Sequence, residues 1–238
     1  MNEGFYKNID ENFESAVELS EKNFSHDDLM QLLQNGNIPQ KQIAALKLDC
    51  VENKTEGKIL VDNLTGCDGK IREAAALKIN QLLIKENNNL NKFLYPEIFA
   101  DATIDINANI CRLVVDSVSI LKQNKEFSKI YLNKILNFIS ETFEELDKFI
   151  FRDKKYVINK QLFKLYWCLE TLKNFTSEID ESLLLKILER ASQEKEYTIR
   201  EKAAQILVNL TNPDFENLKS RLINDENYYV REVFRIKT

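Results

Sequence analysis

Apolar residues recur at helical spacing along most of this chain. The clearest stripe places a large apolar residue at every third or fourth position, at Ile158, Leu162, Leu165, Leu169 and Leu172. Positions spaced in this way lie on one face of an α-helix, the face that turns toward a core. The pattern therefore predicts one long helix, which follows a charged junction at residues 147–155 and ends near Asn174.

Shorter stripes of the same kind divide the rest of the chain into further helices. Polar residues that can cap a helix, such as Asp10, Ser25 and Asp180, precede several of these stripes. Short polar connections between consecutive stripes are typical of antiparallel helix pairs. The predicted helices cover residues 10–22, 25–36, 38–53, 55–64, 69–85, 90–103, 107–123, 126–145, 180–188, 196–210, 214–224 and 227–238.

One segment is repeated along the chain. Residues 68–83 begin with an acidic cap, continue with a β-branched residue and an arginine, and then alternate small and large apolar residues; residues 196–210 keep this order. Partial copies occupy residues 37–48 and 227–234. A period of about 30–47 residues built from two helices is typical of an α-solenoid, because one helix pair cannot bury its apolar face alone. The basic or equivalent positions of successive copies are Lys41, Arg72, Arg112, Asn159, Arg200 and Arg231.

The two strongest copies resemble the first helix of HEAT repeats. They read Asp68-x-x-Ile-Arg72-x-x-Ala75-Ala76 and Glu196-x-x-Ile-Arg200-x-x-Ala203-Ala204. The resemblance implies an all-α fold, an α-α superhelix in the form of a HEAT-like solenoid of about five to six antiparallel helix pairs. It also implies a single domain over residues 1–238. Within that domain we expect an N-terminal capping helix pair at 1–36, repeats at 37–226 and a C-terminal capping helix at 227–238.

The repeated arginines have two interpretations. In the family that the chain resembles, an acidic cap and the arginine stack between repeats as a structural ladder, and arginine suits such bidentate pairing. A row of arginines that binds phosphate is the alternative. We favour the structural interpretation, which assigns inter-repeat roles to Asp68, Arg72, Arg112, Glu196, Arg200 and Arg231.

The resemblance also implies a binding surface. In such solenoids the second helix of each pair lines the concave side, so the polar face of that helix is the expected contact with a partner. The side chains there mix amides with both signs of charge, which suits an acidic or mixed peptide surface better than a phosphate backbone. The candidate residues are Lys58, Asp62, Lys129, Asn133, Asn137, Lys186, Arg190, Asn217 and Arg221.

The single tryptophan lies in an aromatic cluster on the long helix predicted near residues 155–174. Lys160, Phe163, Lys164 and Trp167 are spaced so that they share one helical face. Lys164 and Trp167 are therefore candidates for holding a partner protein or a stacked base. The alternative, which we favour, is that the aromatic rings fill the space between long central helices.

Composition and charge narrow the function classes. With only 5 Gly and 3 Pro, the chain has little material for the tight turns of a β-sandwich or barrel. The net charge of −5 disfavours a surface devoted to nucleic acid or anionic lipid. The chain has no basic leader, and no apolar run approaches the ~18–20 residues that would cross a bilayer. We expect a cytoplasmic protein with no membrane association.

The sequence offers little catalytic chemistry. His26 is the one histidine, and its place after the capping residue Ser25 predicts a solvent-facing residue in a first helical turn. The four cysteines are widely separated, which is typical of reduced thiols. Nucleotide-binding, hydrolase and EF-hand motifs are absent from the sequence. We therefore predict no catalytic residue, no metal site and no cofactor.

These observations favour a non-enzymatic HEAT-repeat scaffold or adaptor that binds another protein or peptide through its concave helical surface. The alternative is a HEAT-like DNA glycosylase of the alkylation-repair type, an enzyme class of similar fold and size. Such enzymes look basic and carry a Trp-rich motif with an essential Asp. Here Trp167 stands alone and is followed by Cys168, Leu169 and Glu170.

The last predicted helix bears on the oligomeric state. A terminal repeat needs a polar outer face, so Val230, Val233 and Phe234 are expected to pack on the preceding pair, with Ile236 near the edge. This arrangement predicts a monomer. If the apolar face were exposed instead, the chain would form a weak end-to-end homodimer.

Overall fold

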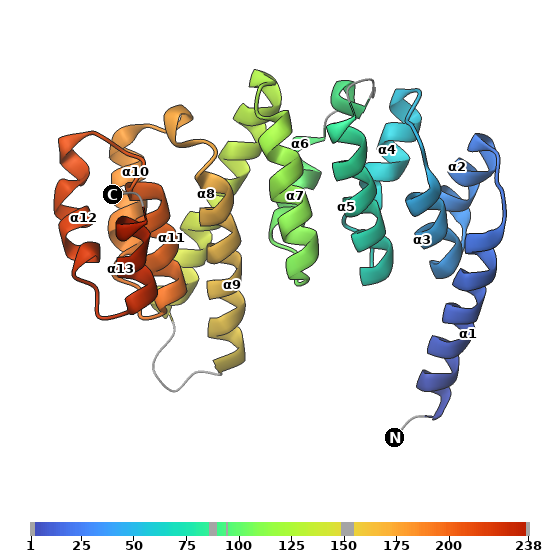
Figure 1. The fold of residues 1–238 in the computed structure, drawn as a ribbon, viewed down its shortest axis with the longest axis horizontal. Helices are drawn as coiled ribbons and strands as arrows, with labels where there is room; N and C mark the ends of the chain where they lie inside the picture. Colours follow the sequence, from blue (N-terminus) through green and yellow to red (C-terminus); the bar gives the residue numbers. More distant parts are fainter. Residues whose placement is uncertain (1–2, 86–89, 94, 149–154, 237–238) are drawn as a thin grey trace. The chain divides into compact units, whose positions relative to one another are not determined.

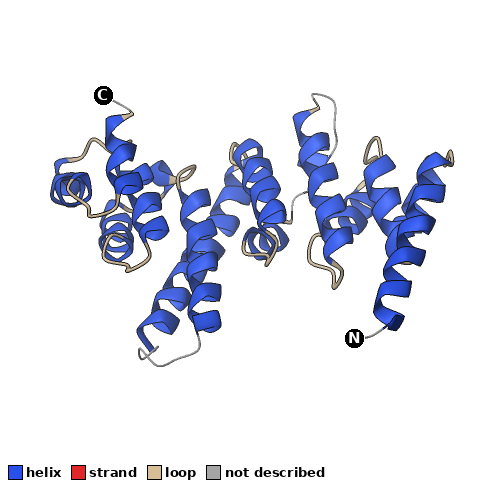
Figure 2. Cartoon of the chain, turned by 60° about the horizontal axis from the view of Figure 1, so that its bottom comes forward, coloured by secondary structure: helices blue, strands red, loops and turns tan. Residues whose placement is uncertain are grey.

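The fold was taken from a computed structural model, which describes residues 3–85, 90–93, 95–148 and 155–236; the side chains of residues 3–10, 12, 91 and 155–157 lie outside that description. Every regular element in these residues is helical, as Figure 2 shows. The predicted all-α class is therefore confirmed. The predicted connection at Asn87 to Asn89 and most of the junction at 147–155 lie outside the described residues.

The described part contains thirteen α-helices (Figure 1) and three single turns of 3₁₀-helix. The α-helices are α1 Glu3–Glu21, α2 His26–Asn35, α3 Ile38–Lys47, α4 Lys54–Asp62, α5 Gly69–Ile84, α6 Pro96–Thr103, α7 Ala108–Leu121, α8 Lys125–Lys148, α9 Lys155–Leu172, α10 Glu181–Ala191, α11 Tyr197–Leu207, α12 Glu216–Ile223 and α13 Tyr228–Arg235. The 3₁₀ turns are η1 Leu90–Lys92, η2 Thr176–Glu178 and η3 Pro213–Phe215.

Capping side chains fix where many of these helices begin. Ser25 and Asp28 form a reciprocal capping box at the start of α2, and Asn37 and Gln40 do the same for α3. Each box satisfies backbone N–H groups that the first helical turn leaves without partners. The predicted cap at Asp10 is wrong, because α1 begins at Glu3. No proline separates Glu3 from Asp10, so the helix continues upstream.

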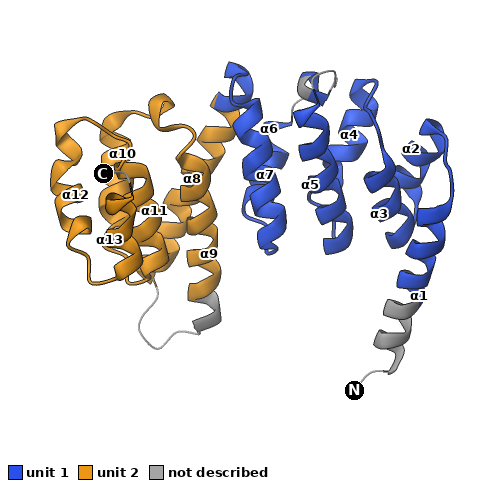
Figure 3. Cartoon of the chain, in the orientation of Figure 1, with its two compact units in different colours: residues 1–128 blue, residues 129–238 orange. Residues whose placement is uncertain are grey.

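Residues 1–128 form the first of two compact units, drawn in blue in Figure 3. The first helices of successive pairs pack side by side, α3 against α5 and α5 against α7. Helix α1 packs on α3, and α2 packs on both α3 and α4. The core between these layers contains fully buried leucines such as Leu33, Leu48, Leu60 and Leu64. The repeat spacing of the sequence thus corresponds to stacked helix pairs.

Residues 129–238 form the second unit. Here α9, α11 and α13 pack in succession, and α12 packs on α11 and α13. The apolar stripe of the long helix contributes Leu165, Leu169 and Leu172, all fully buried. At the end of the chain Val230 is fully buried while Ile236 is 78% exposed, as predicted for a helix that packs on the preceding pair.

Small residues explain how closely the first helices stack. Ala75 and Ala76 in α5, and Ala203 and Ala204 in α11, are at most 1% exposed. A methyl side chain at these positions lets a neighbouring helix approach, whereas a larger side chain would force the two axes apart. The boundary between the units falls inside α8, and the prediction of one domain over residues 1–238 stays a prediction.

Candidate functional site

An open apolar groove lies within the second unit, between α8 and α10, each of which is the second helix of its pair. It has a volume of about 160 Å³. Helix α8 provides one wall and α10 the other. The lining side chains are Leu136, Ile139, Ser140, Phe143, Leu183, Lys186 and Ile187.

The local sequence accounts for the groove. Leu136, Ile139 and Phe143 are three and four residues apart, so α8 presents them on one face. On α10, Asp180 caps the helix by accepting a hydrogen bond from the backbone N–H of Leu183. Leu183 then lies in the first turn and remains 40% exposed. The result is an apolar surface with solvent access and one lining cation, Lys186.

Arg190 joins α10 to the C-terminal end of α8 beside the groove. Its Nη2 donates to Asp147 Oδ1 at 2.5 Å, and its Nη1 forms an ion pair with Glu194 Oε1 at 2.8 Å. The guanidinium also lies 5.4 Å from the centroid of the Phe143 ring, which lines the groove. Burial raises the pKa of Glu194 above its ordinary value even though the charge of Arg190 opposes the change. Arg190, a predicted partner contact, is thus already held by its own chain.

The other predicted contacts in this unit divide into two groups. Lys186 lines the groove and is exposed. The other exposed candidates, which do not line the groove, are Lys129, Asn133 and Asn137 on α8 and Asn217 on α12. Arg221 instead donates hydrogen bonds to the hydroxyl of Ser192 and, at 3.4 Å, to the carbonyl oxygen of Glu189. In the first unit, Lys58 and Asp62 of α4 form an exposed ion pair at 2.5 Å and neutralise each other.

Trp167 is a core residue and is not available as the predicted partner contact. It is 7% exposed, and its ring makes edge-to-face contacts with Phe163 and Tyr166. Lys164 on the same helix is half-buried. This burial agrees with the interpretation favoured from the sequence, in which the aromatic rings of the long helix pack in the core, and it removes Trp167 from the candidate partner contacts, because the neighbouring rings cover the indole.

Two of the repeated arginines, Arg72 and Arg200, form a ladder between consecutive repeats. Arg72 donates from Nε and Nη2 to the two carboxylate oxygens of Asp105, at 2.7 and 3.3 Å. Its Nη1 donates to the carbonyl oxygens of Gly66 and Cys67, at 2.9 and 3.1 Å. One guanidinium therefore fastens the loop before α5 to the loop before α7.

Arg200 repeats this geometry in the second unit. It donates to both carboxylate oxygens of Asp225, at 2.7 and 3.0 Å, and to the carbonyl oxygens of Glu194 and Lys195, at 2.8 and 2.9 Å. Burial opposes ionisation of Asp225, but hydrogen bonds from Arg200 and from the backbone N–H of Asn227 outweigh it. The pKa of Asp225 therefore lies below its ordinary value.

The acidic partners differ from those that the sequence suggested. Asp68 accepts hydrogen bonds from the backbone N–H groups of Lys70 and Ile71, so it caps α5 and does not pair with Arg72. Glu196 likewise precedes α11 without pairing with Arg200, whose acids are Asp225 and Glu226. A signal for the true partners exists in the sequence, because Asp105 and Asp225 each stand two residues before an asparagine cap.

Arg112 is not part of the ladder. It is exposed and lies one residue beyond the ladder position, which Cys111 occupies. The Cys111 thiol donates to the carbonyl oxygen of Asp105, six residues earlier, at 3.0 Å. Arg72 and Arg200 likewise donate to the carbonyl oxygen six residues before them. Arg231 does hold a ladder position, with Nη1 donating to the carbonyl oxygens of Asp225 and Glu226.

His26 also differs from its prediction. The imidazole is 26% exposed, and its Nε2 lies 3.0 Å from Glu56 Oε2 in the first turn of α4. The predicted solvent-facing residue therefore joins two helices. Its partner lies 30 residues away, and no local pattern in the sequence indicated the contact.

None of the described helices combines the length and the apolar character needed to cross a membrane. No protein-family model matches the chain, and a comparison with curated proteins found no match.

Similar solved structures come from engineered proteins. One engineered protein of the Northeast Structural Genomics Consortium is 15% identical, with a TM-score of 0.52 and coverage of 90% of this chain and 96% of its own. A second from the same source is 12% identical (TM-score 0.47, coverage 90% and 94%), and a designed armadillo repeat protein is also 12% identical (TM-score 0.44, coverage 89% and 97%). The first likeness concerns the fold alone. Together with the stacked helix pairs and the arginine ladder, it identifies an all-α helical-repeat architecture.

Proposed function

We propose that this chain is a non-enzymatic scaffold of the HEAT-repeat type that binds another protein through the groove between α8 and α10. The observation that carries the proposal is the open apolar lining of that groove. The HEAT assignment rests on the ladder arginines Arg72 and Arg200 and on the paired alanines beside them.

The chemistry of the lining favours an amphipathic helix as the bound segment. Apolar side chains three or four residues apart on such a helix fit a groove between two helices. Lys186 adds one cation to the lining and favours an acidic residue on the partner. The rigid helices on both sides limit the entropy that is lost on binding.

The same lining supports a binding role over a catalytic one. Lys186 is the only titratable side chain among the residues that line the groove, so the groove holds no acid and base pair. The repair-enzyme alternative is weakened by the burial of Trp167, which leaves no exposed indole to stack on a base.

A peptide selection on the full chain tests the proposal. A library of helical peptides would be selected against the protein, and the dissociation constant of each bound peptide measured by fluorescence anisotropy. Leu183→Glu places a charge in the groove and is expected to weaken binding by at least about tenfold. The matched control is Ile223→Glu on α12, where the wild-type residue is 47% exposed and lies outside the groove lining.

The control is expected to change the dissociation constant less than about twofold. Selected peptides should carry apolar residues at helical spacing and one acidic residue. Replacing that acid with lysine should weaken binding to the wild type, and Lys186→Glu in the protein should restore the affinity. Peptides that bind the Leu183→Glu variant as well as the wild type, or a library that yields no binder, would refute the groove as the binding site.

A further inference from the structure

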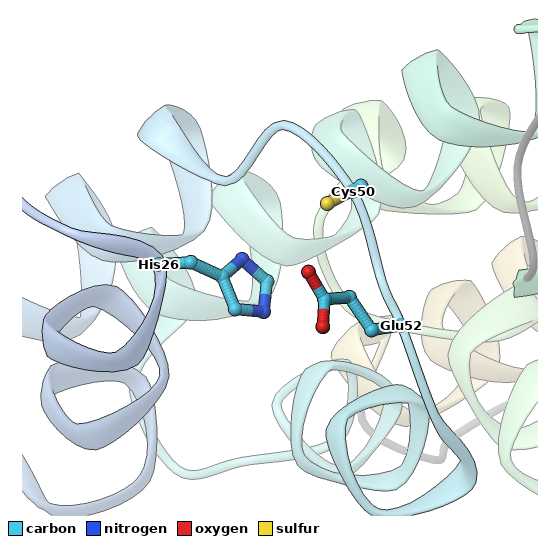
Figure 4. A group of neighbouring side chains, drawn as sticks. All are labelled: His26, Cys50 and Glu52. Carbon is cyan, nitrogen blue, oxygen red and sulfur yellow. The ribbon is translucent and has the colours of Figure 1, made fainter.

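Three side chains of the kinds that bind transition metals meet in the first unit, outside the groove. His26 is the first residue of α2, while Cys50 and Glu52 belong to the segment that joins α3 to α4. One potential ligand atom from each lies within 4.8 Å of the others. Figure 4 shows the Glu52 carboxylate extending toward the imidazole, with the Cys50 thiol beside it.

Glu56 holds this arrangement in place. Its Oε2 lies 3.0 Å from His26 Nε2 and accepts a hydrogen bond from the backbone N–H of Glu52 at 2.8 Å. Its Oε1 accepts from Asn53 Nδ2 at 2.5 Å, and Asn53 in turn caps α4. A carboxylate that fixes a histidine ring is a common outer partner in metal sites, because it orients the ring. Glu56 thus orients the His26 ring and also holds the loop that carries Cys50 and Glu52.

The local charge favours a cation. The negative charges of three acids, Asp49, Glu52 and Glu56, surround the Cys50 thiol, and the positive charge of Lys85 opposes them. Cys50 and Glu52 are exposed, so a metal ion would reach the cluster from solvent without any opening of the fold.

The set of donor atoms selects the metal. A thiolate, an imidazole and a carboxylate are the ligands that Zn²⁺ takes in proteins. Ca²⁺ and Mg²⁺ prefer oxygen donors throughout, which this set does not provide. We propose that His26, Cys50 and Glu52 form a Zn²⁺ site, with one coordination position left for water or for a side chain of a partner.

Cobalt(II) provides a direct test, because a bound thiolate gives Co²⁺ an intense near-ultraviolet charge-transfer absorption. The full chain is titrated with Co²⁺ and then with Zn²⁺. The expected result is one Co²⁺ per chain with thiolate absorption that Zn²⁺ abolishes. Cys50→Ser should lose this absorption. Cys67→Ser is the matched control, because Cys67 is also an exposed thiol of the first unit but lies outside the cluster.

The remaining ligands are tested by affinity. In competition with a chromophoric chelator, His26→Gln and Glu52→Gln are each expected to weaken Zn²⁺ binding at least about tenfold, with unchanged helical circular dichroism. Co²⁺ that binds without thiolate absorption, thiolate absorption that persists in Cys50→Ser, or equal Zn²⁺ affinity in all variants would overturn the site. The groove between α8 and α10 is not involved, so either result leaves the proposed binding function unaffected.

Discussion

At the scale of single residues, the ladder works because Arg72 and Arg200 each donate hydrogen bonds to two loops at once. A guanidinium has five N–H donors in a planar fork, so one edge binds a carboxylate while another nitrogen reaches carbonyl groups. Asp105 offers the carboxylate to Arg72, and the side chains of this pair are only 9% and 11% exposed. The cap residue Asp68 has a different role, because its Oδ1 accepts hydrogen bonds from two backbone N–H groups in the first turn of α5.

This geometry explains what the sequence could and could not predict at the residue scale. The repeated arginine was visible because its surroundings recur within a few positions. Asp105 lies 33 residues from Arg72, and Asp225 lies 25 residues from Arg200, so each pair is too far apart to be recognised within one repeat, although each aspartate has a local mark in its place two residues before an asparagine cap. Arg112 was misplaced because a basic residue stands next to the ladder position that Cys111 fills.

Removing a ladder arginine should destabilise the fold. Arg72→Ala leaves the Asp105 carboxylate buried without its cation, and the expected loss is about 3 kcal/mol in the free energy of unfolding. Urea denaturation followed by circular dichroism measures it. Arg112→Ala is the control, and its exposed side chain predicts a change within about 0.5 kcal/mol. Equal effects of the two substitutions would contradict the ladder.

At the scale of helices, the sequence was most informative. Caps and apolar spacing are local, so the helix pairs were predicted, most of them with boundaries close to those observed. Three ranges were wrong: α1 begins at Glu3 and not at residue 10, α3 ends at Lys47 and not at residue 53, and the range 90–103 is a 3₁₀ turn followed by α6 from Pro96. The groove was not predicted, since it depends on the distance between α8 and α10. Its residues were partly found: Lys186 was a candidate, whereas Leu183 and Phe143 were not, because an apolar residue on a helix looks the same in sequence whether it is buried or lines a groove.

Helix α4 offers a test of packing against intrinsic preference. An alanine normally stabilises a helix relative to glycine. At Gly57, however, an added Cβ would lie 2.9 Å from the Cβ of Phe93, which is too close. Gly57→Ala is therefore expected to lower the melting temperature, with a cost of about 1–3 kcal/mol.

Gly69 provides the comparison, because an added Cβ there meets its nearest neighbour, Arg72 Nη2, at 3.8 Å, an ordinary contact. Gly69→Ala is expected to stabilise the protein by about 0.5 kcal/mol. A higher melting temperature for both variants would show that Phe93 moves aside without cost.

At the scale of the whole molecule, contacts run between neighbouring repeats. Within each unit a first helix packs on the first helices before and after it. In such proteins stability is approximately a sum of repeat terms and nearest-neighbour terms, and damage stays near its origin. The repeat period let the sequence predict this architecture, although it gave no indication of two compact units.

Local damage can be measured by amide hydrogen exchange. Arg72→Ala removes the link between the loops before α5 and α7, so exchange is expected to accelerate in those two helices. Helices α11 and α13 of the second unit should keep their wild-type rates, because Arg200 holds their link independently. A uniform acceleration along the chain would mean that the repeats unfold as one cooperative block.

Arg231 shows how the ladder could be used to lengthen the protein. Its Nη1 binds the carbonyl oxygens of Asp225 and Glu226, while within the described residues no carboxylate forms an ion pair with it. Arg72 and Arg200, in contrast, also donate to both oxygens of an aspartate. A designed helix pair grafted after α13, with an aspartate two residues before an asparagine cap, would offer that carboxylate to Arg231. The same hydrogen bonds that link two natural repeats would then attach a designed one.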